Sequence, residues 1–503
     1  MSAENRNRRG KYKNYSEYEK EHLVRVEMQT AASAGLPAYH IRPKSGLLND
    51  PNGFSYYNGL WRLFYQAFPF GAVHGAKSWA AVVSRDLVRW EYRGLALLPD
   101  TEFDSHGVFS GSALTIGDEF LLFYTGNARS DDGARRSCQV CAAMDKTGKF
   151  VKRFPPFISA PPAGYTAHFR DPQAFSHGGE YRMLLGAQNE TLQGKILVYK
   201  SKDARNWKLS GELDFSERFM GYMIECPNLV FVDGRPILIF CPQGLAQSVA
   251  PYPNIHPNMV LVGDAYDDET NTILSDGTLR NFDDGFEFYA AQAMTAPDGR
   301  VLAVGWVGLP DTDTPTEKEN WAHCLSLIRE LTLKEGRLFS YPVKETETLR
   351  KERRDISVGG NGIWPVRTMG AEANRCELEL RIPEGVSGSV LSAADENGEN
   401  ALTVSFDSLS GEVCADRSAV TGWREQRGDT VRKSKVSAGR DMVLNIFIDR
   451  SVFEIFINKG EKSITGRFFP QNGNGNIFIT AKAPDPGAKI KGSFWGMEAS
   501  VKF

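Results

Sequence analysis

The sequence lacks an excess of charge of either sign. Its 59 Lys and Arg residues against 62 Asp and Glu residues leave a formal net charge of −3. Proteins that bind nucleic acids or anionic membranes normally carry a basic excess, so we expect neither partner. No apolar run approaches the roughly 20 residues of a membrane helix. Residues 1–12 are polar and basic with no apolar stretch behind them, which is unlike a secretion signal and predicts a cytoplasmic protein.

Cysteine and histidine are also scarce. The seven cysteines, an odd number, are scattered along the chain, which is typical of a reduced protein. Cys138 and Cys141 form a C-x-x-C pair, but no second pair accompanies them and their surroundings predict a strand. The eight histidines form no H-x-H or H-E-x-x-H pattern. We therefore expect neither a bound metal nor another cofactor.

A strand–turn–strand unit recurs five times in the first two thirds of the chain. Its turns are centred on Gly59, Gly117, Gly179, Gly234 and Gly299, at a spacing of roughly 60 residues. Five units of short strands with this period predict an all-β fold, a five-bladed β-propeller over residues 37–348. A two-sheet sandwich is the alternative, but it would not need five equivalent hairpins.

The segments on either side of these five units have different sequence patterns. Residues 1–36 are predicted to be an N-terminal extension that is partly helical, with a helix over 15–33 ended by Gly35 and Pro37. Residues 349–503 alternate apolar and polar side chains at 377–382, 402–406 and 442–457, with glycine-rich turns between them. This pattern predicts a C-terminal antiparallel β-sandwich. Asp449, Arg450 and Ser451 head its clearest strand, and we interpret them as structural, with a contribution to the rim of a functional site as the alternative.

Three acidic residues precede the apolar strand of their units, and a proline follows each of them closely. They are Asp50, Asp171 and Glu225. The innermost strands of a propeller line one channel, so these carboxylates should converge there. Converging carboxylates repel one another and raise at least one pKa unless a cation compensates, and Arg170 is the obvious candidate. Such a cluster predicts a catalytic site.

Two chemistries fit three converging acids. In glycoside hydrolysis one carboxylate attacks the sugar or activates water, and a second protonates the leaving oxygen. In a calcium or magnesium site all three would bind the cation. Arg170 would oppose a bound cation, which favours the hydrolase.

Five motifs of this chain, in order, resemble those of glycoside hydrolase family 32. They are L-N-D-P-N-G at 48–53, F-S-G-S at 109–112, F-R-D-P at 169–172, E-C-P at 225–227 and F-Y-A-A-Q at 288–292. The similarity runs from about residue 39 to 342, and I-D-R-S-V-F-E-I-F at 448–456 extends it. Other stretches, at 107–109, 124–127 and 321–324, are most similar to bacterial members that cleave sucrose 6-phosphate.

The resemblance implies a retaining mechanism on a five-bladed propeller followed by a β-sandwich. Asp50 would be the nucleophile, Glu225 the general acid and then base, and Asp171 the residue that stabilises the transition state. As an acid at neutral pH, Glu225 needs a raised pKa, for which Asp50 across the pocket is the expected cause. The resemblance further implies a sugar pocket lined by Leu48, Asn49, Gln66, His74, Trp79, Phe109, Ser110, Arg170 and Tyr289.

Several of these residues have structural alternatives. Gln66 would otherwise satisfy strand backbone, and Phe109, Trp79 and Tyr289 would otherwise pack in the core. Cys226, next to Glu225, is predicted to point to the opposite face of an extended segment.

The resemblance implies a β-fructofuranosidase that takes a small sugar, sucrose 6-phosphate or sucrose. Arg129, Arg135 and Arg136 are the candidates for phosphate contacts, with simple solvation as the alternative. An exo-acting fructan hydrolase and a non-catalytic sugar-binding propeller are the other readings. The fold also hosts inverting arabinosidases and xylosidases, but the N-D-P-N-G and E-C-P contexts favour a fructosidase.

Overall fold

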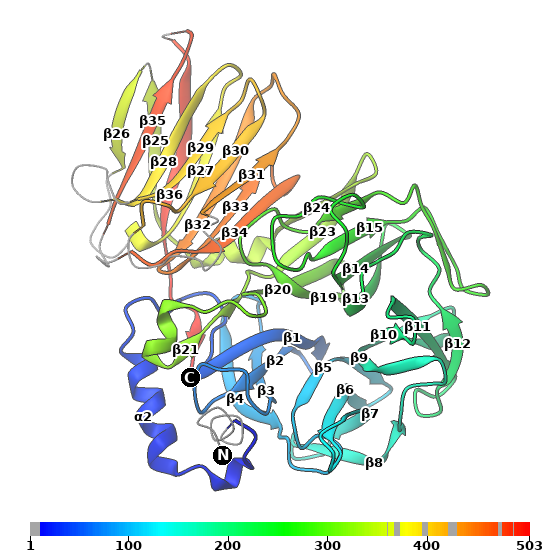
Figure 1. The fold of residues 1–503 in the computed structure, drawn as a ribbon. Helices are drawn as coiled ribbons and strands as arrows, with labels where there is room; N and C mark the ends of the chain where they lie inside the picture. Colours follow the sequence, from blue (N-terminus) through cyan, green and yellow to red (C-terminus); the bar gives the residue numbers. More distant parts are fainter. Residues whose placement is uncertain are drawn as a thin grey trace.

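The computed structural model describes residues 11–359, 361–366, 373–394, 401–420, 430–470, 475–485 and 487–503. It is an all-β protein, a five-bladed propeller followed by a β-sandwich (Figure 1). This confirms the predicted fold class. None of the helices in these residues is long and apolar enough to cross a membrane.

Each blade is built from strands that follow one another in the chain. The first three blades contain β1 (Gly46–Tyr57), β2 (Leu60–Phe68), β3 (Ser78–Ser84) and β4 (Trp90–Leu97); β5 (Val108–Ile116), β6 (Glu119–Arg129), β7 (Arg135–Met144) and β8 (Phe150–Ile158); and β9 (Tyr165–His177), β10 (Glu180–Asn189), β11 (Gly194–Ser201) and β12 (Lys208–Glu212). The last two contain β13 (Met223–Val232), β14 (Arg235–Gln243), β15 (Met259–Val262) and β18 (Leu279–Asn281); and β19 (Tyr289–Thr295), β20 (Val301–Val307), β23 (Arg329–Lys334) and β24 (Arg337–Pro342), with β22 (Cys324–Leu325) beside β20. A separate hairpin, β16 (Ala265–Asp267) and β17 (Thr272–Leu274), follows β15.

The five predicted turns are all present between the first two strands of the blades. Their glycines, Gly59, Gly117, Gly179, Gly234 and Gly299, have φ between 56° and 87°. Side chains other than glycine adopt this left-handed region at a cost, so the glycines fix these hairpins. The hairpin signal in the sequence is thus confirmed in each blade.

A ring of hydrogen bonds ties the innermost strand of each blade to the next. One side-chain oxygen per blade accepts a backbone N–H from its neighbour. The bonds run from Gly111 to Asn52 Oδ1 (2.8 Å), Ala174 to Ser112 Oγ (2.8 Å), Leu229 to Gln173 Oε1 (2.8 Å), Ala293 to Asn228 Oδ1 (3.2 Å) and Phe54 to Gln292 Oε1 (2.7 Å). The last bond joins the fifth blade to the first, so the ring is closed and the channel that it surrounds has a fixed shape.

Segments distant in sequence complete the first blade. β21 (Trp321–Ala322) pairs in parallel with β1, and β37 (Val501–Lys502) pairs in parallel with β4. The 3-10 helix η2 (Pro315–Glu319) precedes β21. The end of the chain therefore returns from the sandwich to the outer edge of the propeller.

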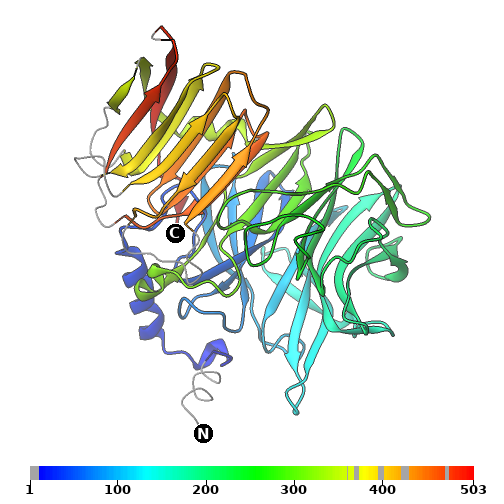
Figure 2. The ribbon, with the colours of Figure 1, turned by 45° about the horizontal axis from the view of Figure 1, so that its top comes forward.

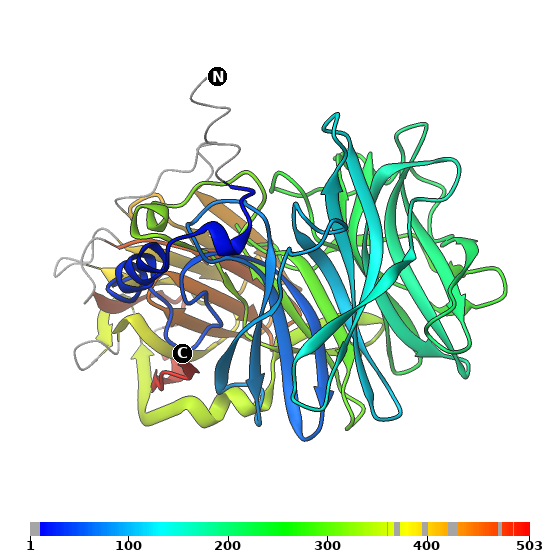
Figure 3. The ribbon, with the colours of Figure 1, turned by 90° about the horizontal axis from the view of Figure 1, so that it is seen from below.

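The N-terminal segment contains two short helices rather than the single predicted one. A 3-10 turn, η1 (Tyr15–Glu17), is followed by α2 (Lys20–Ala31). Figure 3 shows α2 on the same side of the propeller as the sandwich, away from the third and fourth blades. The predicted boundaries after residues 36 and 348 stay predictions; β24 ends at Pro342, and η3 (Lys344–Leu349) leads into the sandwich.

The sandwich consists of two six-stranded sheets (Figure 2). One contains β25 (Arg350–Gly359), β36 (Lys489–Met497), β27 (Arg375–Ile382), β32 (Met442–Asp449), β33 (Val452–Ile457) and β34 (Lys462–Arg467), and the other contains β26 (Gly362–Val366), β35 (Asn476–Lys482), β28 (Ser387–Ala394), β29 (Leu402–Asp407), β30 (Glu412–Asp416) and β31 (Val431–Lys435). The predicted stretch 442–457 is a hairpin, because Arg450 adopts a φ of 59° and turns the chain between β32 and β33.

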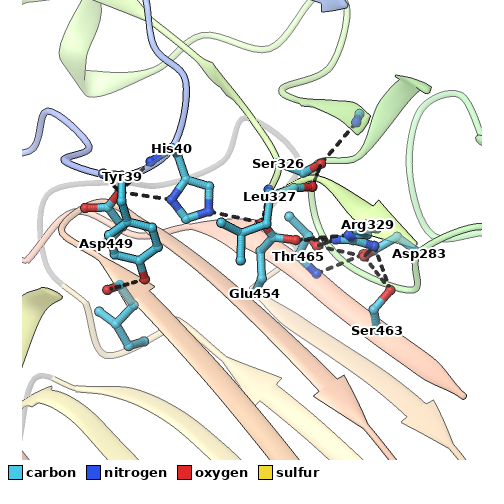
Figure 4. Close-up of polar contacts among 12 residues, drawn as sticks. Tyr39, His40, Asp283, Ser326, Leu327, Arg329, Asp449, Glu454, Ser463 and Thr465 are labelled. Carbon is cyan, nitrogen blue, oxygen red and sulfur yellow. Dashed lines mark hydrogen bonds and ion pairs between the residues drawn. The ribbon is translucent and has the colours of Figure 1, made fainter. Parts of the chain in front are cut away.

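A buried polar network joins the sandwich to the propeller (Figure 4). Asp449 accepts the backbone N–H groups of residues 38–40, which supports its structural interpretation. His40 lies between Asp449 (2.9 Å) and Glu454 (3.0 Å). Glu454 also binds Arg329, which pairs in turn with Asp283 (3.1 Å). All five side chains are fully buried, so the two domains are packed through charged groups that compensate one another.

Candidate active site

The innermost strand of every blade contains a bulge at the same level. The irregularities lie between residues 48 and 51 of β1, 108 and 111 of β5, 170 and 173 of β9, 225 and 228 of β13, and 289 and 292 of β19. A bulge re-aims the side chains of the residues that it contains. The predicted acids all lie in or beside these bulges, so the structure brings them together where the strands converge on the channel.

Asp50 is held by two neighbours in the bulge region. Its carboxylate accepts hydrogen bonds from Ser110 Oγ (2.5 Å) and Asn49 Nδ2 (3.1 Å). Burial raises the pKa of Asp50, the bond from Ser110 partly offsets this, and the charge of Glu225 raises it further. The residue is half-buried, so the carboxylate is fixed in orientation and still reachable from the channel.

Glu225 is the most heavily hydrogen-bonded of the three acids. One oxygen accepts from Arg170 Nη2 (2.8 Å) and Nε (3.2 Å), and the other accepts from Tyr289 OH (2.7 Å) and Gln243 Nε2 (2.8 Å). Burial raises the pKa of Glu225, but the Arg170 charge and these hydrogen bonds outweigh it and leave the pKa below its ordinary value. The predicted rise, with Asp50 as its cause, is therefore wrong for the free site, because Arg170 pairs with Glu225.

Asp171 carries the raised pKa instead. Its backbone has a φ of 67°, and its N–H donates to Thr125 Oγ1 (3.0 Å). Burial raises its pKa to about 7, against the charge of Arg170, which lies 3.9 Å from its carboxylate. The prediction that the cluster raises at least one carboxylate pKa is thus confirmed for Asp50 and Asp171.

Cys226 was predicted to point to the face opposite Glu225 in an extended segment, and the structure places it against Asp171. Its N–H donates to Asp171 Oδ2 (3.0 Å), and its thiol lies 3.7 Å from the same oxygen. The alternation of an extended strand does not apply here, because Cys226 has a φ of 47° in the bulge.

A chain of side-chain hydrogen bonds supports Asp50 from behind. Asn49 Nδ2 donates to Gln66 Oε1 (2.6 Å), and Gln66 Nε2 donates to Ser110 Oγ (2.9 Å). Both bonds of Gln66 go to side chains of the site, so the alternative that it satisfies strand backbone is not supported. Lys77, which the sequence reading missed, donates to Asn49 Oδ1 (2.5 Å).

Lys77 is a buried lysine, 4% exposed. Burial lowers its pKa to about 7, while the charge of Asp50 acts in the opposite direction. His74 Nδ1 lies 3.0 Å from its ammonium group. The signal that points to Lys77 is a lone lysine directly before the fully buried strand β3, because such a residue is rarely buried without a role.

The remaining predicted pocket residues divide into two groups. Phe109 is half-buried beside Ser110, and His74 is exposed next to Lys77, so both border the site. Leu48 and Trp79 are fully buried in the hydrophobic core. Trp79 Nε1 donates to the carbonyl of Phe109 (3.1 Å), so it supports the pocket wall from behind.

Gln243 is a further residue that the sequence reading missed. It ends β14, which pairs with the strand of Glu225, and no motif distinguishes it from other strand-end glutamines. Only the strand pairing places its amide on the carboxylate.

The described residues contain no group of three or more His, Cys, Asp or Glu side chains arranged to hold a metal ion. The guanidinium of Arg170 lies beside two of the three acids. The three carboxylates suit glycoside hydrolysis: Asp50 is oriented for attack, Glu225 is held by hydrogen-bond donors, and Asp171 binds a proton.

Comparison with known proteins agrees with this chemistry. The model of the glycosyl hydrolases family 32 N-terminal domain matches residues 40–342, and that of the family 32 C-terminal domain matches residues 345–494. The chain belongs to glycoside hydrolase family 32 and is a glycosidase. The predicted resemblance is confirmed.

Individual relatives cover nearly the whole chain. A sucrose-6-phosphate hydrolase of Pediococcus pentosaceus is 45% identical over 92% of this chain and 91% of its own. The structure of a sucrose-6-phosphate hydrolase from Lactobacillus gasseri is 40% identical, with a TM-score of 0.92 over 98% of this chain and 99% of that chain. A Bombyx mori family 32 β-fructofuranosidase in complex with sucrose is 28% identical, with a TM-score of 0.81 over 96% of this chain and 98% of that chain.

Proposed function

We propose that this protein hydrolyses the β-fructofuranosidic bond of sucrose 6-phosphate and of sucrose. The observation that carries the proposal is the convergence of Asp50, Asp171 and Glu225 from three blades, each held by different partners. The similarity to sucrose-6-phosphate hydrolases over nearly the full length supports the choice of substrate.

In the proposed mechanism Asp50 attacks the anomeric carbon of the fructosyl unit. Glu225 protonates the glycosidic oxygen as the bond breaks, so the glucose moiety leaves and a fructosyl ester of Asp50 remains. Glu225 then takes a proton from water, which attacks the ester and releases fructose with its configuration retained. Asp171 holds fructose hydroxyls and stabilises the positive charge that develops on the ring.

The roles of the neighbours follow from their contacts. Ser110 and Asn49 fix the direction of the Asp50 carboxylate, which is what a nucleophile requires. Tyr289 and Gln243 fix Glu225 by donating to the same oxygen. Retention requires the carboxyl groups of Asp50 and Glu225 to be about 5–5.5 Å apart in the reacting complex.

Glu225 must acquire a proton before it acts as an acid. A sugar in the pocket removes water from Glu225 and competes for Arg170, and both changes raise the pKa of Glu225. We therefore propose that the active protonation state forms on substrate binding: Glu225 gains a proton, and Asp171, which binds a proton near pH 7 in the free site, gives one up and is ionised when it stabilises the charge on the ring.

The proposed substrate also suggests a compartment. A sugar phosphate is charged and does not cross a membrane unaided, so the substrate would arise inside the cell, and we propose a cytoplasmic location.

The test is fructose release by the purified protein from sucrose 6-phosphate and from sucrose at matched concentrations. Turnover of either supports the proposal, and the ratio of the two kcat/KM values gives the preferred substrate. Release from short fructans but from neither disaccharide would replace it with an exo-acting fructan hydrolase. Binding of these sugars without release from any would leave a sugar-binding propeller.

A further inference from the structure

Two arginines lie opposite each other on neighbouring strands of the second blade, and no carboxylate of the described residues pairs with either. Arg129 ends β6 and Arg135 begins β7, and the two are directly opposite in the antiparallel pairing. Like charges at such positions are destabilising. Among the residues that the structure describes, neither guanidinium forms an ion pair. The nearby carboxylate of Asp132 accepts from Ser130 Oγ and the Ala134 N–H within its own loop.

The strand face that contains Arg135 faces the third blade. Arg135 shares this face with Ser137, whose hydroxyl donates to the carbonyl of Ala167 (2.8 Å). Burial, together with the charges of Arg170 and Arg129, lowers the pKa of Arg135 to about 10, and the charge of Glu225 acts in the opposite direction. Arg135 is thus a half-buried cation in a neighbourhood with more positive than negative charge.

His168 lies in the same place. Its Nδ1 is 3.2 Å from Arg170 Nη1. Burial, together with the charges of Arg170 and Arg135, lowers its pKa to about 4. His168 is therefore neutral at physiological pH, and with Nδ1 facing the guanidinium its other ring nitrogen carries the hydrogen and is a donor.

This group of residues is connected through Arg170 to Glu225, the proposed general acid, which acts on the leaving group. Arg170 binds Glu225 and contacts His168 Nδ1, and Arg135 is close enough for the charges of Arg170 and Glu225 to act on it. Arginine pairs with phosphate through two parallel hydrogen bonds, and a phosphate monoester carries close to two negative charges at pH 7. A phosphate on the leaving glucose would supply the anion that Arg129 and Arg135 lack.

We propose that Arg135, with Arg129 and His168 beside it, binds the phosphate of the leaving glucose and so selects the phosphorylated substrate. This inference rests on the proposed function. Arg136 lies on the other face of the same strand. This face contains Cys138, which is close to Asp104, and it does not face the third blade. Of the three arginines predicted as phosphate contacts, Arg136 is therefore assigned to solvent, and it provides a matched control.

The experiment compares wild type, Arg135→Ala, Arg135→Lys and Arg136→Ala. For each, kcat/KM is measured for sucrose 6-phosphate and for sucrose, and inhibition is measured with glucose 6-phosphate and with inorganic phosphate. The ratio of the two kcat/KM values should fall 10- to 100-fold in Arg135→Ala, which corresponds to about 1.4–2.8 kcal/mol. Arg135→Lys should recover part of the ratio, because it keeps the charge and loses the paired hydrogen bonds. Arg136→Ala should keep the wild-type ratio.

Inhibition by glucose 6-phosphate should weaken in Arg135→Ala by a factor similar to the fall in the ratio. An unchanged ratio of the two kcat/KM values in Arg135→Ala would overturn the proposal. If the ratio were unchanged and only inhibition by inorganic phosphate weakened, Arg135 would belong to a site for free phosphate, and the proposal would fail as well. An equal loss on both substrates would overturn it as well, since it would indicate a structural role. If wild type released fructose from neither substrate, the proposed function itself would fail, whereas turnover of both with a ratio near one would refute only the phosphate site.

Discussion

Protonation of His40 should make the stability of this protein depend on pH in a window above neutrality. The imidazole is fully buried between the carboxylates of Asp449 and Glu454. Burial lowers the pKa of His40, but the hydrogen bonds and charges of the two carboxylates outweigh it and raise the pKa from 6.5 to about 9. The histidine is therefore a cation in the native protein at neutral pH.

The size of the effect follows from this difference in pKa. At 1.36 kcal/mol per pH unit, a change from 6.5 to about 9 corresponds to about 3 kcal/mol of native-state stabilisation. Because the folded-state pKa is the higher one, the contribution is complete below pH 6.5 and is lost as the pH rises through about 9. The lowered pKa values of Asp449 and Glu454 act in the acid range, so they do not contribute to this window.

The assay is urea unfolding of wild type and His40→Gln at pH 6, 7.5 and 9. Wild type should lose about 3 kcal/mol more than His40→Gln between pH 6 and 9, and the variant should be the less stable protein at pH 6. His177→Gln, in the third blade outside this network, should follow wild type. Parallel pH dependences of wild type and His40→Gln would refute the reasoning.

The remaining predictions concern the catalytic site. Glu225→Gln should slow substrates with poor leaving groups about 10²–10⁴-fold and activated fructosides far less, as steady-state kinetics will show; an equal loss on both would argue against an acid role. In wild type the decrease of kcat on the alkaline side of its pH profile should occur at higher pH than the decrease of kcat/KM, because bound substrate raises the pKa of Glu225. Decreases at the same pH would contradict this. Lys77→Met should lower kcat/KM at least 10-fold by releasing Asn49, with the far-ultraviolet circular dichroism unchanged; wild-type kinetics would assign Lys77 to packing. A chelator should leave turnover intact, and a large drop would restore the metal-site alternative.

Much of the fold was predictable because its signals are local. The turn glycines fix five hairpins through their own backbone preference, and the acids lie within the first strand of three blades. The bulges were not predictable, since a bulge depends on the pairing of two strands and leaves no period in the sequence. For that reason Cys226, predicted to point away, faces Asp171.

The electrostatics of the site also depend on tertiary contacts. Arg170 is adjacent to Asp171 in sequence, yet its short hydrogen bonds go to Glu225, 55 residues later. The pKa of Glu225, which was expected to be raised, is therefore lowered, while that of Asp171 is raised. Gln243 reaches Glu225 through strand pairing alone. Residue types and their order thus identified the chemistry, while the distribution of protons required the packing of the blades.

The most direct test of the account is to trap the fructosyl intermediate. The variant Glu225→Gln lacks the general base for the second step. It is mixed with an activated β-fructofuranoside, denatured and digested with a protease, and the masses of its peptides are measured by mass spectrometry. One added hexosyl group is expected on the peptide that contains Asp50, and none in the double variant Glu225→Gln, Asp50→Ala. A hexosyl group on another residue, or steady turnover by the double variant, would contradict the assignment of Asp50 as the nucleophile.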